Sequence, residues 1–138
     1  MSFIAWKNYL SVGHERIDEQ HKKLVGIIND FFDSVQRGAD ENTLPGIVED
    51  LLKYAGYHFE YEEEMMRTAE YPELEKHRKE HIDLTEKVVA YKQRLEEGDN
   101  IISAQLLDFL KDWLLNHLMV SDKDYAPYVQ SLGFDPEG

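Results

Sequence analysis

The segment LPGIVEDLLKYAGYHFEYEEEMM, residues 44–66, carries the pattern that decides the fold. Its apolar residues recur every three or four positions, which is the spacing of the buried side of an α-helix. These residues are Leu44, Ile47, Val48, Leu51 and Ala55. At the same spacing, the next inward positions are His58 and Glu62. An ionisable pair on a buried face needs partners, because an unpaired buried polar group costs about 1 to 3 kcal/mol.

Three further segments have the same helical period, and short breaks containing Gly38, Pro72 or Gly98 separate the four. The pattern predicts helices at about residues 18–37, 43–66, 72–97 and 100–120. Connections of about two to five residues force neighbouring helices to run antiparallel. We therefore expect an all-α, up-down-up-down antiparallel four-helix bundle. Residues 1–138 form one domain, with an N-terminal arm (1–16) and a short C-terminal helical turn.

The composition excludes several classes of protein. The chain has 138 residues, 15 of them basic and 28 acidic, and its formal net charge is −13. This charge repels nucleic acid and anionic membrane surfaces. There is no cysteine, which excludes disulfides and thiolate metal sites, and no apolar run long enough for membrane insertion. The N-terminus lacks the features of a signal peptide, so we expect a cytoplasmic protein.

Five of the six histidines occupy inward positions of the predicted helices: His21, His58, His77, His81 and His117. A single histidine on an apolar face is usually a core residue whose nitrogens are hydrogen-bonded. In an antiparallel bundle, however, the starts of the first and third helices lie level with the ends of the second and fourth. All five imidazoles and Glu62 should therefore meet at one end of the core. A purely structural bundle would have to explain this clustering as coincidence.

A metal centre explains the cluster, because it takes up nitrogen and oxygen lone pairs directly. Five histidines and a carboxylate exceed the needs of one four-coordinate zinc and suit two ions that share a bridge. Imidazole ligands favour iron, copper, zinc or nickel, and a bridging carboxylate argues against a copper pair. A second carboxylate should lie near His117. Asp122 is the best placed, where the fourth helix ends and a side chain can turn back, and Asp124 is a weaker competitor.

Four motifs in this order and spacing resemble the hemerythrin family, and the likeness runs from about Trp6 to Tyr128. The motifs are I-D-E-Q-H (17–21), H-F-x-x-E (58–62), H-x-x-x-H (77–81) and W-L-x-N-H-x-x-x-x-D (113–122). The resemblance implies a non-haem centre of two iron ions with an oxo or hydroxo bridge. By this likeness, one iron is bound by His77, His81 and His117, the other by His21 and His58, and both are bridged by Glu62 and Asp122.

The ligand count then leaves one open position, on the iron with two histidines. The resemblance implies reversible dioxygen binding there, for oxygen transport, storage or local delivery, with an oxygen-consuming protein as a possible partner. We expect no enzymatic activity, because a histidine-rich centre disfavours the high-valent iron that oxidises substrates. The alternatives are a di-iron oxidase or peroxidase and a module that senses oxygen or nitric oxide. The sequence does not indicate the oligomeric state.

An oxygen site should also exclude water, since water and protons promote the loss of bound oxygen. Candidate walls are Phe59, Trp113, Leu114 and Leu118, which are equally well placed for ordinary core packing. Tyr125, one turn after Asp122, is a candidate hydrogen-bond donor to a ligand. The remaining glutamates near Glu62, namely Glu60, Glu63 and Glu64, are interpreted as a solvated face.

Overall fold

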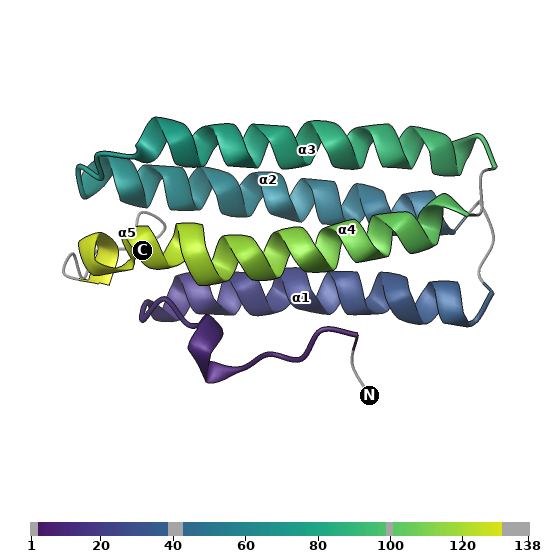
Figure 1. The fold of residues 1–138 in the computed structure, drawn as a ribbon, viewed down its shortest axis with the longest axis horizontal. Coiled ribbons are helices and arrows are strands. Elements are labelled where there is room, and N and C mark those ends of the chain that lie inside the picture. The colour runs from purple at the N-terminus through teal and green to yellow at the C-terminus, as the bar shows by residue number, and fades with distance from the viewer. Residues whose placement is uncertain (1–2, 39–42, 99–100, 131–138) are drawn as a thin grey trace.

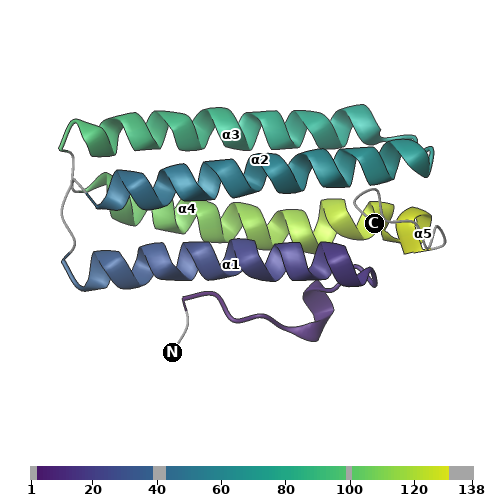
Figure 2. The same ribbon diagram turned by 180° about the vertical axis from the view of Figure 1, so that it is seen from behind.

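A computed structural model describes residues 3–38, 43–98 and 101–130 of the chain. The chain forms four long helices. Figure 1 shows that they run side by side in alternating directions, and Figure 2 shows them from behind. They are α1 (Glu15–Gln36), α2 (Leu44–Thr68), α3 (Leu74–Glu96) and α4 (Ile102–Asn116). The described residues contain no strand. The predicted all-α, antiparallel four-helix bundle is confirmed.

The helix ends differ from the predicted ends by a few residues. α1 begins at Glu15, three residues early, because the His14 side chain caps it by accepting a hydrogen bond from the Ile17 N–H. Its end matches the predicted stop, since Gly38 has φ +75°, a left-handed conformation that glycine adopts at little cost. Thr43 precedes α2 without a capping hydrogen bond from its side chain, and the other candidate cap, Asn42, lies outside the described residues.

The apolar stripes pack into two clusters that lie on either side of the inward histidines along each helix. On α1, for example, Ile17 belongs to one cluster and Leu24 to the other, with His21 between them. The larger cluster fills the bundle, and the smaller one includes Met65, Met66 and the ring of Tyr125. The polar positions therefore form a buried layer between two apolar clusters.

The fourth helix was expected to end just before Asp122. Instead, the helical backbone continues past this residue. A π-helical segment, His117–Ser121, follows α4 directly and leads into α5 (Asp122–Gln130). The short C-terminal turn is thus a helix of nine residues. The rest of the predicted tail, residues 131–138, lies outside the described residues.

The N-terminal arm packs along α1 (Figures 1 and 2). Ile4 is buried, and its N–H donates a 2.8 Å hydrogen bond to Asn29 Oδ1. Phe3 stacks on Phe32 with 4.6 Å between the ring centroids. Before α1 the arm forms one 3-10 turn, Asn8–Leu10. None of the described helices has an apolar stretch long enough to be a transmembrane segment.

Candidate metal centre

The polar residues on the helix stripes meet at the end of the bundle where α1 and α3 begin and where α2 and α4 end (Figure 1). The bundle brings all seven of the predicted ligands into one buried cluster, and each is between 0 and 3 % exposed. They are His21, His58, Glu62, His77, His81, His117 and Asp122. The other end of the bundle places no charged side chain or histidine in the core of the described residues.

Three histidines form one half of the cluster. His77 and His81 lie one turn apart on α3, and His117 follows α4. One atom from each, together with one from Glu62, lies within 4.8 Å of every other, a spacing that can hold a metal ion. His81 Nε2 lies 3.2 Å from Glu62 Oε1, and His117 Nε2 lies 3.1 Å from Asp122 Oδ1. His77 Nε2 faces both carboxylates, at 3.5 Å from Glu62 Oε1 and 3.0 Å from Asp122 Oδ1.

Two histidines form the other half. His21 from α1 and His58 from α2 form a second group with Glu62 within the same 4.8 Å limit. His21 Nε2 lies 2.8 Å from Glu62 Oε2 and 3.1 Å from Asp122 Oδ2. His58 Nε2 lies 2.9 Å from Glu62 Oε2.

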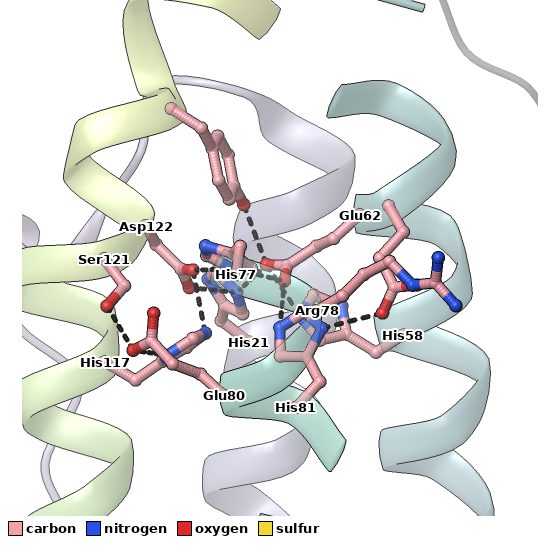
Figure 3. A network of polar contacts seen from close by, with 12 residues as sticks. His21, His58, Glu62, His77, Arg78, Glu80, His81, His117, Ser121 and Asp122 are labelled. Atoms are coloured by element: carbon pink, nitrogen blue, oxygen red, sulfur yellow. Dashed lines mark hydrogen bonds and ion pairs between the residues drawn. The ribbon is translucent and has the colours of Figure 1, made fainter. Parts of the chain in front are cut away.

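The two carboxylates lie between the histidine groups, as Figure 3 shows. Oε1 of Glu62 faces His77 and His81, whereas its Oε2 faces His21 and His58. Asp122 is divided in the same way, because its Oδ1 faces the three-histidine group and its Oδ2 faces His21. Each carboxylate thus offers one oxygen to each half, which is the arrangement that a bridging ligand requires.

The π-helical segment explains how Asp122 reaches the cluster. In an α-helix, residues five apart point about 140° away from each other, so His117 and Asp122 would face different directions. The wider π turn, closed by a hydrogen bond from the Asp122 N–H to the His117 carbonyl, brings both side chains to one face. The structure places Asp122 beside His117, but it does so through a π turn in a continuous helical backbone and not at the end of a helix. Asp124, the competing candidate, is exposed.

Three residues that were not predicted as part of the site lie at the outer nitrogens of three histidines. His58 Nδ1–H donates a 2.6 Å hydrogen bond to Gln20 Oε1, and His81 Nδ1–H donates one of 2.9 Å to Glu63 Oε2. His117 Nδ1 lies 3.5 Å from Glu80 Oε1, which also accepts a 2.6 Å hydrogen bond from Ser121.

The interpretation of Glu63 as part of a solvated face is therefore wrong, since its carboxylate contacts His81 from the flank of α2. A sequence signal for such partners exists. Gln20, Glu63 and Glu80 each stand directly beside a predicted ligand in the chain, and each reaches a histidine on the next helix. A polar residue next to an inward one lies on the seam between two helices.

Tyr125 is fully buried, and its hydroxyl donates a 2.7 Å hydrogen bond to Glu62 Oε2. Burial, followed by the negative charges of Glu62 and Asp122, raises the pKa of Tyr125 well above its ordinary value, so the hydroxyl keeps its proton. The tyrosine is thus a donor to a carboxylate between the two histidine groups.

Burial alone would raise the pKa of Glu62, but His58 and hydrogen bonds with the other histidines hold it well below its usual range. Burial lowers the pKa of His58, which favours the neutral ring. Its Nδ1 proton points to Gln20, so its Nε2 lone pair faces the Glu62 carboxylate. Two acceptors face each other at 2.9 Å, and this contact is unfavourable unless a cation lies between them.

The donor set of the three-histidine half fits a metal ion. Its inward atoms have no hydrogen-bond partner among the described residues. These atoms are Nε2 of His77, His81 and His117, Oε1 of Glu62 and Oδ1 of Asp122. Each such buried atom costs about 1 to 3 kcal/mol when left unpaired, and a bound cation removes that cost. Imidazole with carboxylate is a ligand set that suits iron, zinc or nickel.

The four candidate wall residues lie on the side of the histidine cluster that faces the larger apolar cluster of the bundle. Phe59 stacks on the His81 ring with 3.8 Å between centroids, and Trp113 stacks on His117 at 4.3 Å. Phe59, Trp113 and Leu114 also line an apolar cavity of about 30 Å³ that continues into the bundle core. Leu118 is fully buried in the same core but does not line this cavity.

Comparisons with known proteins agree with this geometry. The sequence profile of the Hemerythrin HHE cation binding domain matches residues 12–129. The bacteriohemerythrin of Stenotrophomonas maltophilia is 31% identical over 134 residues, which cover 95% of this chain and 84% of that protein. The myohemerythrin of Theromyzon tessulatum is 37% identical over 120 residues, covering 87% and 88%.

A crystal structure of wild-type hemerythrin superposes on the fold with a TM-score of 0.83, covering 94% of this chain and 99% of that one at 24% identity. The bacteriohemerythrin of Pseudomonas aeruginosa PAO1 is 32% identical over 130 residues, or 94% of this chain and 84% of that protein. Family membership implies a protein that binds oxygen at a di-iron centre, and the clustered histidines and glutamate are in keeping with it. The chain belongs to the hemerythrin family.

Proposed function

We propose that this protein binds dioxygen reversibly at a centre of two iron ions and serves oxygen transport, storage or local delivery. His77, His81 and His117 would hold one iron, His21 and His58 would hold the other, and Glu62 and Asp122 would each offer one oxygen to each iron. The observation that carries the proposal is the division of both carboxylates between the two histidine groups. When bound, the two ferrous ions supply the electrons that reversible dioxygen binding requires.

The protein's own residues do the positioning. Gln20 and Glu63 fix the orientations of His58 and His81 by accepting a hydrogen bond from the outer nitrogen of each ring, and Glu80 lies 3.5 Å from the outer nitrogen of His117. Tyr125 holds one oxygen of Glu62. Because the ligand sets contain three and two histidines, the halves are unequal, and an ion held by His21 and His58 would have one protein ligand fewer than the other.

The apolar wall supports carriage over oxidation of a larger substrate. Phe59 and Trp113 cover the rings of His81 and His117, so water is kept from that side of the cluster. The adjoining cavity of about 30 Å³ takes a molecule of only a few atoms. We infer that the chain acts as an oxygen carrier and not as an oxidase or peroxidase.

The test begins with metal-free protein loaded anaerobically with ferrous iron, followed by a count of iron per chain. Oxygen is admitted and then purged through several cycles while visible spectra are recorded. We expect two irons per chain and a charge-transfer band that develops and vanishes in each cycle. Permanent conversion in the first cycle, or turnover of an added reductant, would favour an oxidase. His117→Ala is the negative control, because it removes a ligand of the three-histidine half.

A further inference from the structure

The residues that hold the outer nitrogens of the histidines differ in charge between the two halves of the cluster. In the three-histidine half carboxylates face two of these nitrogens: Glu63 accepts a hydrogen bond from His81, and Glu80 lies 3.5 Å from the outer nitrogen of His117. In the two-histidine half the partner of His58 is an amide, Gln20, which is 3 % exposed. The outer nitrogens of His21 and His117 have no hydrogen-bond partner among the described residues.

A carboxylate and an amide act differently on the ring that they face. A carboxylate that accepts the Nδ1–H draws the proton toward itself, so Nε2 becomes a stronger donor to a metal. The negative charge of Glu63 also stabilises a more highly charged ion nearby, and Arg78 Nε, 3.3 Å from Glu63 Oε1, offsets part of that charge. The hydrogen bond of His58 to Gln20 is the shorter one, at 2.6 Å, but it joins two neutral groups. It therefore orients the ring without adding charge.

We infer that Glu63 and Glu80 are positioning residues that make the three-histidine position the first to become ferric, while Gln20 keeps the two-histidine position ferrous. This inference rests on the proposed function, since it assigns an order of oxidation to the two irons. The consequence is a division of roles between the two irons. The iron at the two-histidine position would stay ferrous and able to take a new ligand, and the iron at the three-histidine position would be oxidised more easily.

The test compares variants that change the charge and keep the shape. Glu63→Gln removes the charge that faces His81, and Gln20→Glu adds one that faces His58. Glu60→Gln is the matched control, because Glu60 is an exposed glutamate on the same helix. Glu80 is left unchanged, since it also holds Ser121 in the π-helical segment.

The first measurement is a spectroelectrochemical titration of the iron-loaded variants, with Mössbauer spectra of samples oxidised by one electron. We expect Glu63→Gln to disfavour the first oxidation about tenfold, which corresponds to about 59 mV for one electron. Gln20→Glu should move the ferric ion toward the two-histidine position. Equal shifts in Glu63→Gln and Glu60→Gln would overturn the inference, as would a wild type whose first ferric ion has two histidines.

The second measurement uses zinc-loaded protein, in which no redox chemistry occurs. In proton NMR spectra, Glu63→Gln should move the His81 Nδ1–H signal upfield, and Gln20→Glu should move that of His58 downfield. If these shifts occur but the iron-loaded protein does not release oxygen, the proposed function fails and the charge asymmetry stands. If neither signal moves, the asymmetry is refuted even where oxygen carriage is confirmed.

Discussion

Tyr125 on α5 donates a 2.7 Å hydrogen bond to Glu62 on α2, and both side chains are fully buried. A hydrogen bond to a charged group contributes about 1.5 to 3 kcal/mol. We expect Tyr125→Phe to lower the free energy of unfolding of the metal-free protein by that amount, because phenylalanine keeps the packing and loses the donor. Urea unfolding in the presence of a chelator measures the change. Tyr9→Phe, at an exposed position, should change it by less than about 0.5 kcal/mol.

Asp122 and Asp124 provide a test of the second bridge. Asp122 is fully buried between the histidine groups, whereas Asp124 is exposed. Asp122→Asn should weaken the binding of the second metal ion by more than about 10-fold, since the amide offers no second anionic oxygen. Asp124→Asn should bind like the wild type. Metal titration by calorimetry, with an elemental count of iron per chain, decides between them, and equal loss in both variants would contradict the assignment.

The π-helical segment His117–Ser121 predicts an unusual tolerance to deletion. Removing Val120, which is exposed, places His117 and the following aspartate four residues apart, and in an α-helix these share a face. We expect this deletion variant to bind two metal ions.

Deleting the exposed Asp112 is the matched control, because α4 has no wide turn to absorb the change before His117. That deletion rotates His117 by about 100° about the helix axis. Circular dichroism verifies that each variant is helical, and iron content is then compared. Loss of iron in both deletions would show that the π turn is itself required.

The metal-free protein should lose stability at alkaline pH. Burial alone would lower the pKa of His77, but the nearby carboxylates of Asp122 and Glu62, 3.0 Å and 3.5 Å from its Nε2, raise it to about 10. The same balance raises the pKa of His21 to about 9. Because these values lie above the unfolded value of about 6.5, the stabilisation is complete below that pH and is lost as the pH rises through 9 to 10.

We therefore expect the Tm of the metal-free protein to fall by more than about 5 °C between pH 6.5 and pH 10. In the metal-loaded protein the imidazole lone pairs are occupied, so these rings hold no proton to lose and the Tm should stay nearly constant. Differential scanning calorimetry of both forms at matched ionic strength makes the comparison. Parallel curves for the two forms would contradict the prediction.

A substitution of Leu114 tests whether this residue keeps water from the site in addition to packing in the core. It is buried, lines the apolar cavity and contributes no ligand atom. Leu114→Ala should keep two irons, lower the free energy of unfolding by about 2 to 5 kcal/mol, and shorten the life of the oxygenated form by admitting water. Leu51→Ala, which opens the same cavity farther along the core, is the control. An unchanged oxygenated lifetime in Leu114→Ala would remove Leu114 from the protective wall.

The sequence by itself determined the helices and the depth of the site. The apolar period of residues 44–66 predicts α2, and the distances of His21, His58, His77 and His117 from their helix ends place them at one level of an antiparallel bundle. These inferences succeed because the α-helix has a fixed rise and a fixed angle per residue, so local spacing converts directly into position.

Only the tertiary structure decided which oxygen of Glu62 faces which histidine, how Asp122 reaches the cluster, and that Glu63 contacts His81. The π turn depends on a backbone hydrogen bond, and the residue types in His117–Ser121 do not predict that bond. Glu63 lies on the flank of α2, where the neighbouring helix alone determines whether a carboxylate meets water or an imidazole. Such contacts depend on how packed helices are rotated relative to one another, and the apolar period of a single helix does not determine that rotation.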